Sequence, residues 1–219
     1  MNIVSNPLGT PLAHRDRFAR RFVQLQAGLV AYGVSMALMI ESRLGLDPWD
    51  VFHQGLSLRT GLSVGTVVIL VGVLVLLLWI PLRQRPGIGT ISNVLVIGVV
   101  VDVALVLLPA PGPLAARTAF LAGGIVLNAF ATGLYIGARL GAGPRDGLMT
   151  GYVARHPHRS IRLVRTVVEL TVLALGWLLG GAVGLGTIAY ALAIGPLTQW
   201  FLPRLTVRDT PRATVIISE

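Results

Sequence analysis

The chain of 219 residues contains no cysteine and little charge: 12% of its residues are charged, against about 25% in an average soluble domain. Without cysteine it can form no disulfide, no thiolate nucleophile and no cysteine-ligated metal centre. Charge this scarce, beside 54% hydrophobic residues, leaves a soluble domain too few polar side chains to cover its surface. The mean hydropathy of +0.77 therefore indicates an integral membrane protein.

Lysine is also absent, and so are the motifs of common hydrolases and nucleotide-binding proteins. There is no H-E-x-x-H and no G-x-S-x-G. The segment Gly87-Ile88-Gly89-Thr90 is not a phosphate-binding loop, because no lysine follows it and no strand precedes it. We expect the four histidines to be solvated in loops or the N-terminal arm: His14, His53, His156 and His158. The sequence therefore predicts neither an enzyme nor a cofactor.

Long apolar runs are what the sequence has in abundance. A bilayer core about 30 Å thick needs roughly 20 apolar residues per helix. Six runs qualify, so we predict an all-α membrane protein with six transmembrane helices, at 22–40, 64–82, 90–108, 118–138, 161–179 and 186–202. The predicted divisions are an N-terminal arm (1–21), a three-helix unit (22–109), a linker (110–117), a second three-helix unit (118–203) and a tail (204–219).

The arginines predict how the chain is oriented. With the N-terminus cytoplasmic, fifteen of the 18 arginines fall on the cytoplasmic side and three outside, namely Arg43, Arg59 and Arg117. Because cytoplasmic loops collect basic residues, this places both termini in the cytoplasm and the linker 110–117 outside. This distribution of arginines also explains the net charge of +9, so nucleic acid is not expected as a partner. Nucleic-acid binding would need an extramembrane domain, and the predicted spans leave no room for one.

Two blocks of the chain recur at nearly one spacing. RLGLDPWDVFHQG (43–55) and RLGAGPRDGLMTG (139–151) share six residues at an offset of 96. GIGTISNVLVIG (87–98) and GLGTIAYALAIG (184–195) share seven of twelve at an offset of 97. Each repeat holds three spans, an odd number, so the second enters the membrane from the opposite side. We therefore predict an inverted-topology repeat.

A short helix is predicted after the first span of each repeat. Asp47-Pro48-Trp49-Asp50 is a helix-start signal, with Asp as the N-terminal cap and Pro in the first turn, and Gly143-Pro144-Arg145-Asp146 repeats it with Gly as the cap. Helices over 48–58 and 144–154 are too short to span a bilayer. They are either interfacial or re-entrant, and the repeat favours partial insertion.

Three blocks carry a resemblance to a known family: Leu44-Gly45-x-x-Pro48-Trp49-Asp50, Gly87-Ile88-Gly89-Thr90 and Leu140-Gly141-Ala142-Gly143-Pro144-Arg145-Asp146-Gly147-Leu148-Met149. They resemble the YczE/YitT-like family of bacterial integral membrane proteins over about residues 20–203. The resemblance implies a multi-pass helical protein of the bacterial plasma membrane, and it implies no particular biochemical activity.

Ionisable residues inside the predicted spans are candidates for function, because a charge in the bilayer is costly unless paired or hydrated. Asp102 lies in the third span with no partner in its own helix. Glu169 lies in the fifth span, four residues after Arg165, so the two are either a structural ion pair or a substrate or proton site. Asp102 aligns with Gln199 of the other repeat, whereas Glu169 aligns with Gly72.

The starts of the short helices supply the other candidates. Asp50 and Asp146 are either elements of the helix starts or ligands. Arg145 stands beside a helix N-terminus, where the helix dipole and a guanidinium together make an anion site. The residue aligned with Arg145 in the first repeat is Trp49, so such a site would be one-sided.

Two functions fit these features. The first is a small secondary transporter or permease for a small solute, anionic if it binds at Arg145, with a proton as a coupling ion. The second is an accessory membrane protein that binds a membrane partner, or a second copy of itself, and moves nothing. A hydrated cavity that reaches Glu169 or Asp102 would favour transport, and a dry, filled bundle the accessory role.

Overall fold

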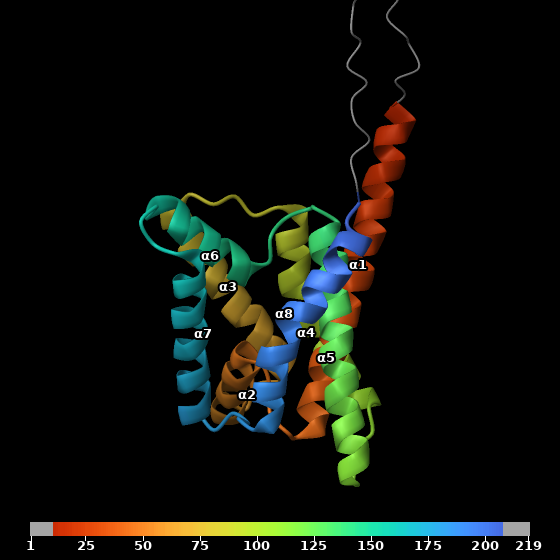
Figure 1. The fold of residues 1–219 in the computed structure, drawn as a ribbon, viewed down its shortest axis with the longest axis vertical. Coiled ribbons are helices and arrows are strands. Elements are labelled where there is room, and N and C mark those ends of the chain that lie inside the picture. Colours follow the sequence, from red (N-terminus) through yellow and green to blue (C-terminus); the bar gives the residue numbers. More distant parts are fainter. Residues whose placement is uncertain (1–10, 208–219) are drawn as a thin grey trace, which may run out of the picture.

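The computed structural model describes residues 11–207, and within that range every regular element is a helix (Figure 1). The eight helices are α1 (Pro11–Ser42), α2 (Pro48–Thr60), α3 (Val64–Leu82), α4 (Ile88–Leu107), α5 (Leu114–Gly137), α6 (Pro144–Arg155), α7 (Ile161–Leu178) and α8 (Leu185–Leu205). The all-α prediction is confirmed. The predicted spans fall within a few residues of α3, α4, α5, α7 and α8 and of the apolar part of α1, Phe18–Ser42, although α1 itself begins at Pro11. The short helices are α2 and α6.

Five of the helices are long and apolar enough to cross a membrane: α1 from Phe18 onward, α3, α4, α5 and α8. The sixth predicted span, α7, does not meet that measure, because Arg162, Arg165 and Glu169 lie within its 18 residues. In Figure 1, α2 lies at the lower end of the bundle and α6 at the upper end, and α7 stands at the left edge.

The short helices begin as their sequences predict. Asp47 caps α2, and its Oδ1 accepts hydrogen bonds from the backbone N–H of Trp49 (2.9 Å) and of Asp50 (3.0 Å). Pro48 occupies the first turn, where the missing N–H costs nothing. Gly61 ends α2 with a φ of 73°, a conformation that glycine adopts without strain. Gly143 takes the capping position of α6.

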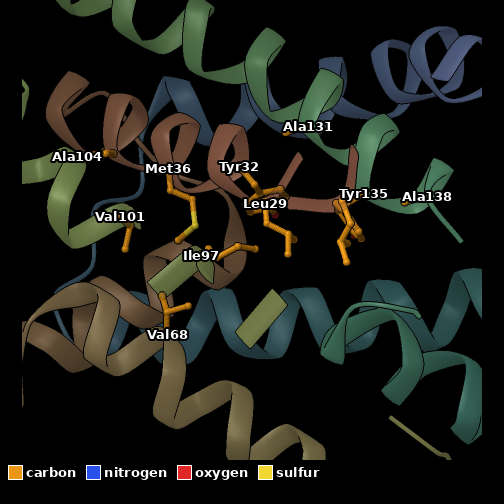
Figure 2. Packing of buried hydrophobic residues seen from close by; sticks show 12 residues of the cluster. Leu29, Tyr32, Met36, Val68, Ile97, Val101, Ala104, Ala131, Tyr135 and Ala138 are labelled. Carbon is orange, nitrogen blue, oxygen red and sulfur yellow. The ribbon is translucent and has the colours of Figure 1, made fainter. Parts of the chain in front are cut away.

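The main core lies among α1, α3, α4 and α5 (Figure 2). Leu29 and Met36 of α1 pack with Val68 of α3, Ile97 of α4 and Ala131 of α5, and all five side chains are buried. In a bilayer such burial gains little from leaving water, because the lipid tails are as apolar as leucine. The helices are therefore held together by close packing and by interhelical hydrogen bonds.

Helices α3 and α4 approach each other closely at Gly65. A Cβ added to Gly65 would lie 1.9 Å from the carbonyl oxygen of Gly98. Gly65→Ala should therefore force the helices apart and lower the free energy of unfolding by about 2 kcal/mol, the usual cost of overpacking. Gly123→Ala in α5, where the new Cβ meets nothing within 4 Å, is the matched control and should leave stability unchanged or slightly raised. Thermal melting of the purified protein measures both, and equal shifts would contradict the expectation.

Two hydrogen bonds join the first half of the chain to the second in a reciprocal way. At the start of α4, Gly89 N–H donates to the Leu140 carbonyl after α5 (2.9 Å). At the start of α8, Gly186 N–H donates to the Leu44 carbonyl after α1 (2.7 Å). The four residues belong to the two recurring blocks of the sequence. The beginning of the last helix of each half is thus fastened to the loop that follows the first helix of the other half.

The helix packing differs between the halves at one place. α3 packs along α4, but α7 packs mainly on α2 and, to a smaller extent, on α6, and no substantial packing joins it to α8. The space between α7 and α8 is where the structure has its large cleft.

Candidate binding site

The cleft has a volume of about 460 Å³ and is partly enclosed. Its walls are α7 on one side and α8 on the other, and its floor is built from α1, α5, and the first turns of α2 and α6. Many of its lining residues are polar or charged: Tyr32, Asp47, Thr132, Tyr135, Arg145, Asp146, Arg165, Glu169, Tyr190, Thr198 and Gln199. A cavity of this size and polarity fits a small polar solute.

Arg145 stands at the floor of the cleft, at the second position of α6. Its guanidinium donates a hydrogen bond to the Tyr32 hydroxyl of α1. Its Nη1 lies 3.8 Å from Asp47 Oδ1, and its Cζ lies 5.6 Å from the centre of the Trp49 ring, within cation–π range. The side chain is 31% exposed. Arg145 is therefore held on three sides and still faces the cleft.

Two carboxyl groups lie beside it in the first turn of α2. Asp47 and Asp50 are each 1% exposed. Asp50 Oδ1 lies 3.3 Å from His53 Nδ1. The second oxygen of each carboxyl group, Oδ2, is buried without a hydrogen-bond partner among the described residues, and so is Trp49 Nε1. Buried polar atoms are almost always paired, so unpaired ones at a cavity are available to a ligand or a proton.

Burial also changes how these groups titrate, and all three lie outside the five candidate spans. Burial, and then the neighbouring Asp50 carboxylate, raise the pKa of Asp47 to about 7, although the positive Arg145 opposes the shift. Burial raises the pKa of Asp50 to about 6, again against Arg145. Burial and Arg145 lower the pKa of His53 to about 3. His53 is therefore neutral near pH 7 and can donate from Nδ1 to Asp50.

The cleft holds two further contacts made by charged side chains. Tyr135 of α5 donates to Asp146 Oδ2 (3.1 Å). Arg165 Nε donates to Glu169 Oε1 (2.8 Å), and these side chains are 61% and 34% exposed. Both pairs leave charge facing the cleft.

A much smaller cavity of about 50 Å³ lies across the same floor, between α3 and α4. Tyr32, Trp49 and Arg145 line both cavities. Asp50 and His53 line only the small one, and Asp47 lines only the cleft. The floor therefore separates two spaces of very different size.

The structure brings most of the predicted site residues together. Arg145, Asp146, Arg165 and Glu169 line the cleft, and the predicted Arg165–Glu169 pair is formed. Asp50 lies at the small cavity instead. Glu169 therefore lines the polar cleft beside Arg165 and is not surrounded by apolar side chains.

Asp102 lies apart from both cavities. It accepts hydrogen bonds from the Ser63 hydroxyl (2.6 Å) and the Gly65 N–H (2.7 Å), at the N-terminus of α3. Its carboxylate thus satisfies the free end of a neighbouring helix, where negative charge is favoured. The Ser63 partner lies 39 residues away in the chain, so inspection of its own helix could not find it.

The prediction that His53 is solvated is wrong. His53 lies inside α2, is 6% exposed and packs between the cavity and Asp50. The helix-start signal at Asp47 already placed it in a helix, and its position one turn after Asp50 was the available signal.

The predicted site residues did not include Asn128 or the three tyrosines that line the cleft, Tyr32, Tyr135 and Tyr190. Tyr190 of α8 donates to Asn128 Oδ1 (3.0 Å), and Asn128 Nδ2 donates to Ser35 Oγ (2.9 Å). Asn128 is completely buried. This chain of hydrogen bonds ties α1, α5 and α8 together behind the cleft. A buried amide in an apolar span was the signal that could have drawn attention to it.

The helices and the polar cleft define a polytopic α-helical membrane protein with a solvent-accessible interior site. The comparisons agree with this class. The chain belongs to a family described as "Family of unknown function (DUF6198)", whose model matches residues 19–203. This family match, together with the relative YczE described below, confirms the predicted YczE-like resemblance.

Relatives from two bacteria are similar over most of the chain. A protein of Haemophilus influenzae, "Uncharacterized protein", is 43% identical over 170 residues, which cover 78% of each chain. The "Uncharacterized membrane protein YczE" of Bacillus subtilis is 36% identical over 180 residues, 81% of this chain and 83% of the relative. The "Uncharacterized protein YyaS" of the same species is 26% identical over 187 residues, 84% of this chain and 92% of the relative. No solved structure matches the chain significantly.

Proposed function

We propose that this protein is a secondary transporter for a small anionic solute in the bacterial plasma membrane. In this proposal α1, α3, α4, α5, α7 and α8 all cross the bilayer, the two halves form an inverted repeat, and both termini are cytoplasmic. α7 crosses despite its three charged residues because two of them, Arg165 and Glu169, face the polar cleft instead of lipid. The role requires no chemistry on the solute.

The observation that carries the proposal is the polar cleft that reaches Glu169. A protein that only binds a partner in the bilayer has no use for a cavity of about 460 Å³ lined by charged side chains. With the termini cytoplasmic, the cleft opens on the cytoplasmic half of the bundle, since Arg165 and Leu202 lie near the cytoplasmic ends of their helices.

The reciprocal fastening of α4 and α8 supports the inverted repeat, and the cavities add a second line of support. When the repeats are aligned at offsets of 96 and 97, many residues lining the small cavity match residues lining the cleft. The matched pairs are Met36 with Thr132, Pro144 with Pro48, Asp50 with Asp146, His53 with Met149, Val68 with Arg165, Gly72 with Glu169, Asn93 with Tyr190, Val94 with Ala191 and Ile97 with Ile194.

The same alignment pairs Trp49 with Arg145, and these two side chains are in contact at the shared floor. The cleft and the small cavity therefore occupy equivalent places in the two repeats, and they differ in volume, about 460 Å³ against about 50 Å³. We propose that the large and the small cavity exchange roles. When α7 closes against α8 and α3 separates from α4, the floor becomes accessible from the opposite side of the membrane. This is alternating access in its simplest form.

The solute is anionic because Arg145 is the group on the floor best placed to hold it. Its positive charge is reinforced by the N-terminus of α6, where the helix dipole favours anions. Trp49 Nε1 offers a further unused donor beside it. A carboxylate or phosphate group fits this arrangement, whereas a cation would meet Arg145 as a like charge.

Ligand-induced stabilisation followed by flux tests the proposal. We expect small carboxylates or inorganic phosphate to raise the melting temperature of the purified protein, and the stabilising anion to accumulate in proteoliposomes. Arg145→Met should lose the stabilisation, while Arg43→Met, at an arginine that lines neither cavity, should keep it. A well-folded protein that is stabilised by no member of such a panel and moves none of them would contradict the proposal.

A further inference from the structure

Asp47 and Asp50 have an arrangement that the binding of an anion does not explain. They are one helical turn apart at the start of α2, both almost fully buried, and they face different spaces. Asp47 lines the large cleft, and Asp50 lines the small cavity between α3 and α4. Each is close enough to influence the titration of the other.

In both carboxyl groups one oxygen has a hydrogen-bond partner and the other has none among the described residues. In each group Oδ1 has a partner, namely the backbone N–H groups of α2 for Asp47 and His53 for Asp50. In each group Oδ2 has none among the described residues. Burying two carboxylates with free oxygens beside one arginine is costly, and the cost falls when one of them carries a proton.

We propose that Asp47 and Asp50 together hold one exchangeable proton, and that this proton is the coupling ion of the transporter. The inference rests on the proposed function for its coupling role, but not for the proton itself. It assigns the proton to α2 rather than to Glu169 or Asp102. Glu169 is paired with Arg165 and is partly exposed, and Asp102 accepts hydrogen bonds at the N-terminus of α3.

The proton takes a balanced path. A proton from water in the cleft adds to Oδ2 of the Asp47 carboxylate and neutralises it. It then passes to the Asp50 carboxylate, so that Asp47 regains its negative charge. When the cavity between α3 and α4 opens, Asp50 releases the proton to water on the other side. The net charge of the pair is the same before uptake and after release.

Arg145 links the proton to the solute. An anion that binds Arg145 withdraws part of the positive charge that holds Asp47 ionised, so Asp47 takes up a proton as the anion binds. By linkage, protonation of Asp47 frees Arg145 and strengthens anion binding by the same factor. Anion and proton therefore bind together, which makes the transporter a symporter.

The other charged and titratable groups around the pair line the same two cavities. The groups that face it are Tyr32 of α1, His53 of α2, Tyr135 of α5, Arg145 and Asp146 of α6, Arg165 and Glu169 of α7, and Tyr190 of α8. α3, which also packs on α2, contributes no titratable side chain. Asp146 already accepts a hydrogen bond from Tyr135.

Infrared spectroscopy of the purified full-length protein tests the site without any transport assay. The carbonyl band of a protonated carboxyl group should disappear with a midpoint near pH 6 to 7. Asp47→Asn and Asp50→Asn should each abolish or strongly shift that transition. The amide oxygen that Asp47→Asn introduces can still accept the capping bonds of α2, so the helix start is preserved. Asp102→Asn, the same chemical change away from both cavities, should leave the transition in place.

The outcomes separate this inference from the proposed function. A band that titrates unchanged in the double variant Asp47→Asn, Asp50→Asn, or no band in this pH range, overturns the inference and leaves anion transport standing. A titrating pair confirmed by the variants establishes the proton site. Inorganic phosphate or the stabilising carboxylate should then accumulate in proteoliposomes when a pH gradient is imposed. If the anion accumulates to the same extent with and without the pH gradient, the coupling role is overturned.

Discussion

Oxidation of the double variant Gly72→Cys, Val94→Cys should form a disulfide rapidly and stop transport completely. A Cβ at Gly72 would lie 3.5 Å from Val94 Cβ, within the range of roughly 3.5–4.5 Å that a disulfide requires. The bond would fasten α3 to α4 and hold the protein with its cleft open. The natural chain has no cysteine, so the variant has no background thiols. Reduction should restore transport.

The pair that matches it in the other repeat is Glu169 and Ala191, which line the cleft from α7 and α8. Glu169→Cys, Ala191→Cys should form a disulfide slowly, because α7 must first close against α8. A bound solute or a change of pH that alters the rate of one cross-link should alter the other in the opposite direction. If the Gly72–Val94 disulfide forms and transport continues, the exchange of roles between the two cavities is wrong. The yields are read on a gel and need no activity from the Glu169 variant.

Arg145→Met should destabilise the protein by about 2 kcal/mol at neutral pH, in addition to abolishing anion binding. Losing one partner of a fully buried ion pair costs about 3–5 kcal/mol. The figure is lower here because Arg145 is 31% exposed and because Asp47 can take up a proton. Arg165→Met is the matched control. Its pair with Glu169 is much more exposed, so its loss should cost less than about 1 kcal/mol.

The pH dependence of Arg145→Met gives a sharper test. Asp47 has a raised pKa of about 7, against an ordinary value of 3.8. Between these values the folded protein binds more protons than the unfolded chain, so this group makes stability fall as pH rises. Without Arg145 the pKa rises further and the fall extends to higher pH. The free energy of unfolding of the variant should therefore approach that of the wild type at low pH and fall further below it above pH 7. A deficit that is equal at all pH values would count against the Arg145–Asp47 interaction. Denaturation curves at several pH values provide the measurement.

The sequence predicted the helices because the signals for them are local. Asp47 and Pro48 act on the turn that directly follows them, and the apolar runs define the long helices without reference to neighbours. The prediction was weakest at α7, where charged residues make the run less apolar than its counterpart α3.

The floor of the site could be predicted only in part, because its contacts join distant parts of the chain. The repeat in the sequence aligns Trp49 with Arg145, but an alignment does not say that aligned residues touch. The contact of Arg145 with Tyr32 spans 113 residues, and nothing in the sequence around Tyr32 distinguishes it from an interfacial tyrosine. Burial of Asp47, which decides its pKa, likewise depends on how α1, α2 and α6 pack.

The two reciprocal hydrogen bonds between the halves have a consequence for biosynthesis. α4 emerges from the ribosome well before Leu140, so the Gly89 N–H at its start has to wait for the second half to complete that bond. The Leu44 carbonyl waits longer still, until α8 arrives. A chain severed in the loop between α4 and α5 should thus yield fragments that persist in cells when both are made and are degraded when either is made alone. Membrane quality control would then spare this bundle only once its last helix is inserted.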